Sequence, residues 1–219
     1  MATYDLEEQE QLDELKTWWK MHGNLVTAAV TVVALVVFAW QGWNWWQRKQ
    51  SADASVLYSG LQQAVAMKDA KRARDIAGEL IDKYSATAYA GMAALLSARA
   101  QSDGGDAKSA AAQLAWAADN AKDDALRDLA RLRLAAAQLD EKAYDEALKQ
   151  LAHEPAAAFA PRFAEMKGDV LAAQGKTADA QAAYAAALAK LDAGKDASRQ
   201  QGAYRDIVQA KLESLGSAK

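Results

Sequence analysis

The sequence contains one long uncharged stretch, which runs from Leu25 to Trp46. Its first sixteen residues read LVTAAVTVVALVVFAW, in which Thr27 and Thr31 are the polar side chains. As a helix rising about 1.5 Å per residue, the whole stretch would span about 33 Å, enough to cross a hydrocarbon core of roughly 30 Å. One central Asp or Arg would cost about 3 kcal/mol of insertion free energy, so the absence of charge favours a membrane-spanning helix.

Tryptophan residues bracket this stretch, as is typical where a membrane helix meets the headgroup region. A buried core helix would have no reason to gather tryptophan at both ends, and it rarely runs this long without charge. A signal peptide should begin with a basic region, whereas the first twenty-two residues hold six acidic and two basic groups. We therefore predict an uncleaved transmembrane helix over residues 23–46. The bracketing residues are Trp18, Trp19, Trp40, Trp43, Trp45 and Trp46.

Charge does not determine the orientation of this predicted span. Lys16 and Lys20 precede it, and Arg48 and Lys49 follow it. The count of basic residues is therefore two on each side, and acidic residues contribute little to topology.

The chain after the span is predicted to be all-α. It is rich in alanine, leucine, glutamate, lysine and glutamine, and no segment after Trp46 alternates as a β-strand would. Residues 53–219 carry twenty-two basic and twenty-three acidic groups, so they lack the positive charge of a nucleic-acid-binding surface. The absence of cysteine excludes disulfides and thiolate metal sites.

Four segments are expected. Residues 1–22 form an acidic tail, in which the first ten residues are expected to be disordered and Leu12, Leu15 and Trp19 have the spacing of a short amphipathic helix. Residues 23–46 form the transmembrane helix, and residues 47–53 form a stalk that could continue it. Residues 54–219 form one soluble domain of ordinary size.

Helical hairpins recur in this domain. The clearest is KGDVLAAQGKTADAQAAYAAAL, residues 167–188, where Gly168 allows close helix approach and Gly175 ends the first helix. Ala180, Tyr184 and Ala187 form the inward face of the second helix, which is the pattern of a tetratricopeptide repeat (TPR). Breaks between helices are predicted at residues 67–70, 85–87, 102–106, 122–124, 140–142, 155–161, 175–177 and 193–198.

The buried small residue of the second helix recurs with a regular period. Ala73, Ala110, Ala147 and Ala180 occupy this position, at separations of 37, 37 and 33 residues, close to the 34-residue period of the repeat. A closing helix over residues 199–215 carries an apolar face that would cover the last repeat. The residues of that face are Tyr204, Ile207, Val208, Lys211 and Leu215.

No catalytic, cofactor-binding or metal-binding residues are predicted. His22 borders the span and His153 lies beside a turn, so the two histidines do not form a metal-ligand pair. Gly104 and Gly105 form a hairpin turn, and Asp123 and Asp124 start a helix. The cluster of Arg127, Arg131 and Arg133 lies one turn from Asp124 and Asp128, which favours a solvated, salt-bridged face.

The sequence as a whole resembles the YfgM family of proteobacteria, the ancillary subunits of the Sec translocon. The resemblance covers the acidic tail TYDLEEQEQLDELKTWWKMHGN, the exit segment WQGWNWWQRKQ, the helix ADASVLYSGLQQAV, the repeat GDVLAAQGK and the closing helix YRDIVQAKLESL. It implies a single-pass protein of the bacterial inner membrane with a cytoplasmic N-terminus and a periplasmic repeat domain. It also implies association with SecYEG and with the membrane-anchored chaperone PpiD in handling newly exported proteins.

A tethered scaffold is the function that both lines of argument favour. Stacked hairpins offer a surface for a peptide or a partner helix, and the anchor keeps that surface near other membrane proteins. A general scaffold of the cell envelope and a membrane-bound regulator facing the cytoplasm remain alternatives. The sequence does not assign individual partner-binding residues.

Overall fold

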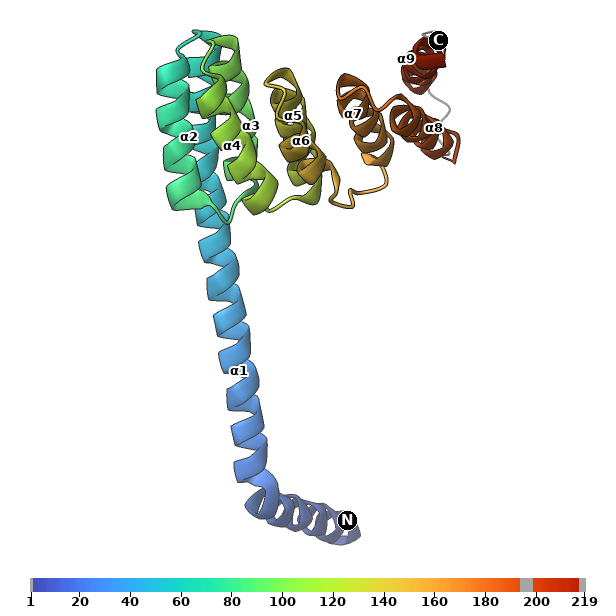
Figure 1. Cartoon of the computed structure of the whole chain (residues 1–219). Coiled ribbons are helices and arrows are strands. Elements are labelled where there is room, and N and C mark those ends of the chain that lie inside the picture. Colours follow the sequence, from blue (N-terminus) through green and yellow to red (C-terminus); the bar gives the residue numbers. More distant parts are fainter. Residues whose placement is uncertain (1, 194–198, 217–219) are drawn as a thin grey trace. The chain divides into compact units, whose positions relative to one another are not determined.

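The computed structural model describes the backbone of residues 2–193 and 199–216, and the side chains of residues 12–193 and 202–216. Within these residues every regular element is an α-helix (Figure 1), which confirms the predicted all-α class. The chain divides into two compact units, Met1–Gln50 and Ser51–Lys219, which are described in turn. The helices are α1 Ala2–Ala66, α2 Ala70–Tyr84, α3 Ala88–Asp103, α4 Ala107–Asn120, α5 Asp124–Asp140, α6 Tyr144–Leu151, α7 Ala160–Ala173, α8 Thr177–Ala193 and α9 Arg199–Gly216.

The first unit consists of the N-terminal part of α1. This helix begins at Ala2, so the expectation of disorder over the first ten residues was wrong. These residues contain neither glycine nor proline, and carboxylates near a helix N-terminus interact favourably with the helix dipole. Both effects favour helix in a segment that looked disordered because of its charge.

The apolar stretch of α1 exposes its large side chains. Leu25 is 72% exposed and Phe38 is 73% exposed. The hydroxyl of Thr27 donates to the carbonyl of Gly23 at 2.8 Å, and that of Thr31 donates to the carbonyl of Thr27 at 2.8 Å. Both hydroxyls are thus satisfied within the helix, as a lipid environment requires. Among the described residues, α1 is the one helix long and apolar enough to cross a membrane.

The second unit is a series of helical hairpins. The end of α1 packs with α2, and the following hairpins are α3 with α4, α5 with α6, and α7 with α8. Figure 1 shows them following one another from teal to brown, with α9 beside α8. First helices of successive hairpins also touch, since α3 contacts α5 and α5 contacts α7. The resulting core is a chain of small clusters rather than one central core, as expected of a repeat array.

All four hairpins turn through the same hydrogen-bonded motif. One residue in each turn has a positive φ: Lys68, Gly105, Lys142 and Gly175, with φ between 58° and 79°. The N–H of this residue donates to the carbonyl three residues back, and the next N–H donates to the carbonyl five residues back, at 2.8–3.0 Å. This is the Schellman arrangement, which satisfies the last carbonyls of a helix.

The residue after the positive-φ position also begins the next helix. In the first two hairpins this residue is an aspartate, Asp69 or Asp106. Its carboxylate accepts the N–H of the residue three positions on, Arg72 at 2.9 Å and Ser109 at 3.0 Å. Hydrogen bonds from Ser109 hold the pKa of the Asp106 carboxyl below its usual value. One residue therefore closes one helix and caps the next.

The turn motif fixes the repeat register independently of the alanine pattern. Each of the predicted marker residues Ala73, Ala110, Ala147 and Ala180 lies five residues after a positive-φ residue, and each is at most 4% exposed. The first repeat, whose sequence pattern is weak, is therefore a true member of the array. Its core contains Leu61, Ala77 and Leu80, all fully buried.

Gly168 permits the close packing of α7 on α8, as predicted from the sequence. A Cβ at this position would lie 2.5 Å from the ring of Tyr184. Tyr184 is 3% exposed, and its hydroxyl donates to Asp169 at 2.7 Å, so the ring has little freedom to move away. The packing of the last repeat therefore requires a residue without a side chain at position 168.

The third hairpin departs from the pattern. Its second helix, α6, has eight residues, and α7 starts at Ala160 with Pro161 in its first turn. The predicted break at 155–161 is therefore misplaced, because the irregular segment runs over residues 152–159. Asp128 of α5, expected on a solvated face, is 3% exposed and accepts the N–H of Ala156 at 2.9 Å. This buried carboxylate satisfies backbone that the short helix leaves without a helical partner.

Helix α9 covers the last hairpin, as predicted. Val208 is fully buried, and Tyr204, Leu212 and Leu215 pack against the same cluster. The prediction that Ile207 also points inward was wrong, because it is 54% exposed. Neighbouring helical residues point about 100° apart, and the buried face is centred on Val208.

A polar cluster joins α9 to the last hairpin. The ammonium of Lys211 donates to Glu165 and to Asp169, each at 2.8 Å. The hydroxyl of Tyr204 donates to the second carboxylate oxygen of Glu165, and that of Tyr184 donates to Asp169. Burial lowers the pKa of Lys211, but its hydrogen bonds to Asp169 and Glu165 outweigh burial and leave the pKa raised. Burial and the carboxylates raise the pKa of both tyrosines.

We predict that Gly168→Ala destabilises the protein. The added methyl would collide with the Tyr184 ring, and overpacking of this kind costs about 1–3 kcal/mol, more than the gain of up to about 1 kcal/mol in helix propensity. The matched control is Gly78→Ala in α2, where a Cβ meets nothing within 4 Å and only the gain applies. Thermal unfolding of the full-length protein in detergent, followed by circular dichroism, should show a lower midpoint for the first variant alone.

We predict that Lys211→Met lowers the unfolding midpoint at pH 7, by the equivalent of about 1–3 kcal/mol, because it leaves two partly buried carboxylates without their cation. The raised pKa means that the stabilising contribution of Lys211 is complete below its unfolded pKa of about 10.4 and is lost as pH rises through the folded value. The difference between the two proteins should therefore shrink above about pH 10.5. A constant difference across pH, or an equal effect of Lys190→Met, would contradict this role.

Candidate protein-binding groove

Of the residues with potential chemistry, His22 and Asp123 make local structural contacts, and His153 is exposed. His22 stacks on Trp18 and contacts its carbonyl, and His153 lies exposed in the segment between α6 and α7. Asp123 caps α5 by accepting the N–H groups of Ala125 and Leu126, as predicted. Over the part of the chain that the structure describes, no group of three or more His, Cys, Asp or Glu side chains could hold a metal ion.

The arginine cluster of α5 divides into different roles. Arg127 pairs with Asp124 and donates to the carbonyl of Ala121 at 2.6 Å, as expected of a salt-bridged face. Arg131 lies 3.8 Å from Asp119 of α4, so it links two helices. Arg133 is exposed and makes no ion pair with the described side chains, which leaves its guanidinium available to a partner.

A groove of about 480 Å³ lies close to Arg133, between α3, α4 and α5. It is formed by the last turns of α3 and α5 and the first turns of α4, so two consecutive hairpins build it. Its position follows from the contact between α3 and α5, which brings the ends of these helices together over α4. The lining residues are Ala98, Arg99, Ser102, Asp103, Ala107, Ala110, Leu114, Arg133, Ala136, Ala137, Asp140 and Glu141.

The floor of the groove is apolar and made of small side chains. Ala98, Ala110 and Leu114 are buried and belong to one core cluster. Ala136 and Ala137 of α5 are half-buried beside them. Because alanine fills little space, the floor leaves room for side chains of a bound segment, and burial of apolar surface would favour that binding.

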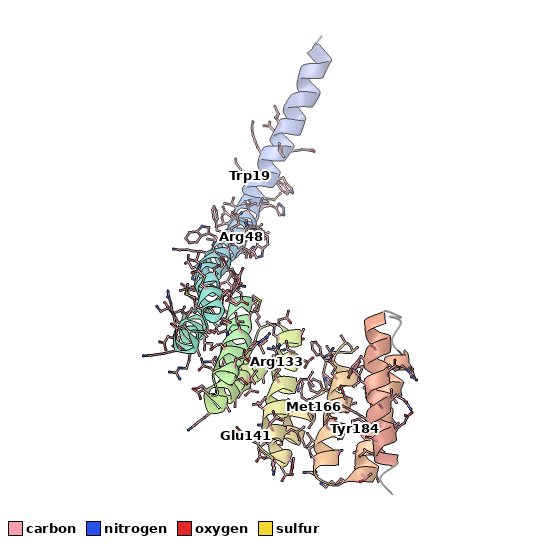
Figure 2. All side chains as sticks on the ribbon, turned by 90° about the horizontal axis from the view of Figure 1, so that it is seen from above. Trp19, Arg48, Arg133, Glu141, Met166 and Tyr184 are labelled. Atoms are coloured by element: carbon pink, nitrogen blue, oxygen red, sulfur yellow. The ribbon has the colours of Figure 1, made fainter. Side chains whose placement is uncertain are left out.

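Charged side chains form the walls. Arg99 and Asp103 of α3 lie 3.8 Å apart and are each 73% exposed. Arg133, Asp140 and Glu141 come from α5 and its C-terminal end, and all are exposed. Arg133 and Glu141 are labelled in Figure 2. The groove therefore combines an apolar floor with polar groups at its rim, which is the usual build of a protein-binding surface.

The groove is held in place by the turn between α3 and α4. Gln101 of α3 is 2% exposed, and its side-chain amide donates to the carbonyl of Ala70 in the preceding hairpin. Arg74 of α2 reaches Asp106 and Ser109 at 3.5 Å. These contacts tie the second hairpin to the first, so the start of α4 presents a fixed edge to the groove.

A second hollow of about 530 Å³ lies between α7 and α8. Its lining is dominated by alanine and Leu171, with Lys167, Asp179 and Lys190 at the edge. It belongs to one hairpin, so the charges at its edge come from one repeat rather than from two. The groove between α3, α4 and α5 is therefore the stronger candidate for binding polypeptide.

Sequence reasoning did not identify the groove residues. The signal that could have located them is the turn register, because Asp103 and Asp140 stand two residues before the positive-φ residues Gly105 and Lys142. Residues at this position end the first helices of two neighbouring hairpins. They come together once α3 and α5 are known to touch.

The comparisons with known proteins agree with this architecture. A family model described as a tetratricopeptide repeat-like domain matches residues 16–217. A protein of Neisseria gonorrhoeae named ancillary SecYEG translocon subunit is 32% identical over 96% of this chain and 98% of its own length. Proteins with the same name from Haemophilus influenzae and Escherichia coli K12 are 31% and 26% identical, over 78% and 83% of this chain and 84% and 87% of their own lengths.

The match to the family model and the near full-length match to the Neisseria protein extend over both the apolar helix and the repeats. The chain therefore belongs to the YfgM family of ancillary SecYEG translocon subunits, which carry a tetratricopeptide repeat-like domain.

Proposed function

We propose that the protein is an accessory of the SecYEG translocon that is anchored in the bacterial inner membrane by residues 23–46. The observation that carries this proposal is the similarity to curated ancillary subunits along nearly the whole chain, apolar helix included. Residues 1–22 form the tail on one side of the membrane. Residues 47–53 connect the span to the repeat domain, residues 54–219, on the other side.

The repeat domain is proposed to face the periplasm, with the N-terminus in the cytoplasm. The resemblance to the family supports this orientation, whereas the basic residues flanking the span are balanced, with Lys16 and Lys20 on one side and Arg48 and Lys49 on the other. In this orientation the repeats stand where newly exported polypeptides emerge.

The proposed action of the repeats is binding without chemical turnover. The groove between α3, α4 and α5 offers an apolar floor and charged walls to a segment of an exported polypeptide or of a partner protein. Anchoring confines the groove to the membrane surface, which raises its effective concentration toward other membrane proteins. SecYEG is one proposed partner, and the chaperone PpiD is the second.

We predict the topology from single-cysteine variants, which the cysteine-free chain allows without background. In intact spheroplasts, Lys149→Cys in α6 should react with a membrane-impermeant maleimide, because the repeats face outward. Glu8→Cys in the tail should react after lysis and not before. The reverse pattern would place the repeats in the cytoplasm and favour a cytoplasm-facing regulator.

We predict that a benzophenone attached at Ser102→Cys, within the groove, crosslinks to exported polypeptides and to translocon components in native membranes. The adducts to exported polypeptides should decrease when export is blocked, because the groove then meets fewer emerging chains. The control is Ala185→Cys on the exposed surface of α8, which should give few adducts. Adducts confined to cell-wall or division proteins would instead support a general envelope scaffold.

A further inference from the structure

The charges around the groove are sorted along its length. Asp103 and Asp140 are the last residues of α3 and α5, and Glu141 follows directly. Two helix C-termini thus meet at this end, where the three carboxylates gather. Arg133 stands seven residues, about two helical turns, before Asp140 on α5, whereas the guanidinium of Arg99 lies 3.8 Å from the Asp103 carboxylate. The groove therefore has an acidic end, with Arg133 as the basic group set apart from it.

Most of these charges lack a partner within the protein. Arg99 and Asp103 lie 3.8 Å apart, the longest distance of any described pair together with that of Arg131 and Asp119. Among the described side chains, Arg133, Asp140 and Glu141 make no ion pair. Charges that face a groove and are not neutralised internally provide electrostatic complementarity to a partner of opposite pattern.

The spacing of these charges sets the length of segment that fits. Arg133 and Glu141 are eight residues apart in and just after α5, which corresponds to about 12 Å along the helix at 1.5 Å per residue. An extended polypeptide covers this distance in about four residues at roughly 3.3 Å each. Between the two ends lies the alanine-rich floor, which suits small apolar side chains.

We infer that the groove binds an extended polypeptide segment in which one basic and one acidic side chain flank about three small apolar residues. The basic side chain lies at the acidic end, near Asp140 and Glu141, and the acidic side chain pairs with Arg133. This inference rests on the proposed function of the groove in binding polypeptide, and it specifies the chemistry of the segment. A segment with both flanking charges of one sign meets repulsion at one end of the groove.

The test uses end-blocked fluorescent nonapeptides and the full-length protein in nanodiscs, with fluorescence anisotropy as the measurement. The peptides have the central sequence KAVAE, its reversal EAVAK, KAVAK and the neutral QAVAQ. At least one of KAVAE and EAVAK should bind more tightly than QAVAQ, and the advantage should fall with rising salt. Arg133→Glu should weaken the binding of that preferred peptide by about fivefold, the size of one exposed ion pair.

The decisive comparison reverses one charge on the protein, with Arg133→Glu, and one charge on the peptide, with KAVAK. Arg133→Glu should bind KAVAK more tightly than the unmodified protein does, because the second lysine then meets a carboxylate. The matched control is Lys122→Glu, which makes the same change of charge in the exposed segment between α4 and α5, outside the groove. Equal binding of all four peptides, or an equal effect of the control, would overturn the inference.

Dimers crosslinked through a benzophenone at Ser102→Cys, with no peptide adduct, would overturn the inference in favour of a second copy of this chain.

The peptide-binding test and the crosslinking test of the proposed function can fail independently of each other. If the groove selects the charged peptides but the protein fails to crosslink to the translocon, the proposed function falls and the chemistry of the groove stands. If translocon adducts form but the peptides bind without charge preference, the proposed function stands and the inference falls.

Discussion

Close approach between paired helices is the constraint on which the repeat domain depends. Each hairpin places an alanine, from Ala73 to Ala180, at the point where its second helix meets its neighbours, and each of these residues is almost completely buried. The last hairpin requires a still smaller residue at its helix contact, because the Tyr184 ring fills the space that Gly168 leaves. Small residues bury little apolar area individually, so the domain gains stability from many short contacts between neighbours in the chain.

Much of this arrangement could be predicted from the sequence, because the features that determine it are local. The uncharged stretch, the glycine at 175 and the alanine that recurs in each hairpin can each be recognised in the sequence without knowing which helices touch. Apart from the N-terminal segment, where local helix propensity was underestimated, the errors arose where tertiary contacts decided the outcome. Asp128 has the sequence context of a surface residue, yet the short helix α6 leaves backbone at Ala156 that needs a buried acceptor. Ile207 is exposed rather than buried, because the contact face of α9 is centred one residue later, on Val208.

The groove was not predictable for a related reason. Its walls come from residues 99 to 103 and residues 133 to 141, which are distant in sequence and carry no motif. Their proximity depends on the contact of α3 with α5, a contact between hairpins rather than within one. The period of the repeats predicts that such contacts exist, but it does not tell which charged side chains lie beside them. The chemistry of a repeat surface thus resides in the residues that the repeat pattern leaves free.

The shared residue of each turn has a consequence for how such chains change in length. Because Asp69, Asp106 and their counterparts end one helix and begin the next, no position inside a hairpin turn can accept an extra residue without losing two sets of hydrogen bonds at once. The distance from turn to alanine is five residues in all four hairpins, while the distance between hairpins differs, most visibly around the short α6. Insertions and deletions in this family should therefore collect in the connections between hairpins, which can lengthen and diverge while the turns stay constant.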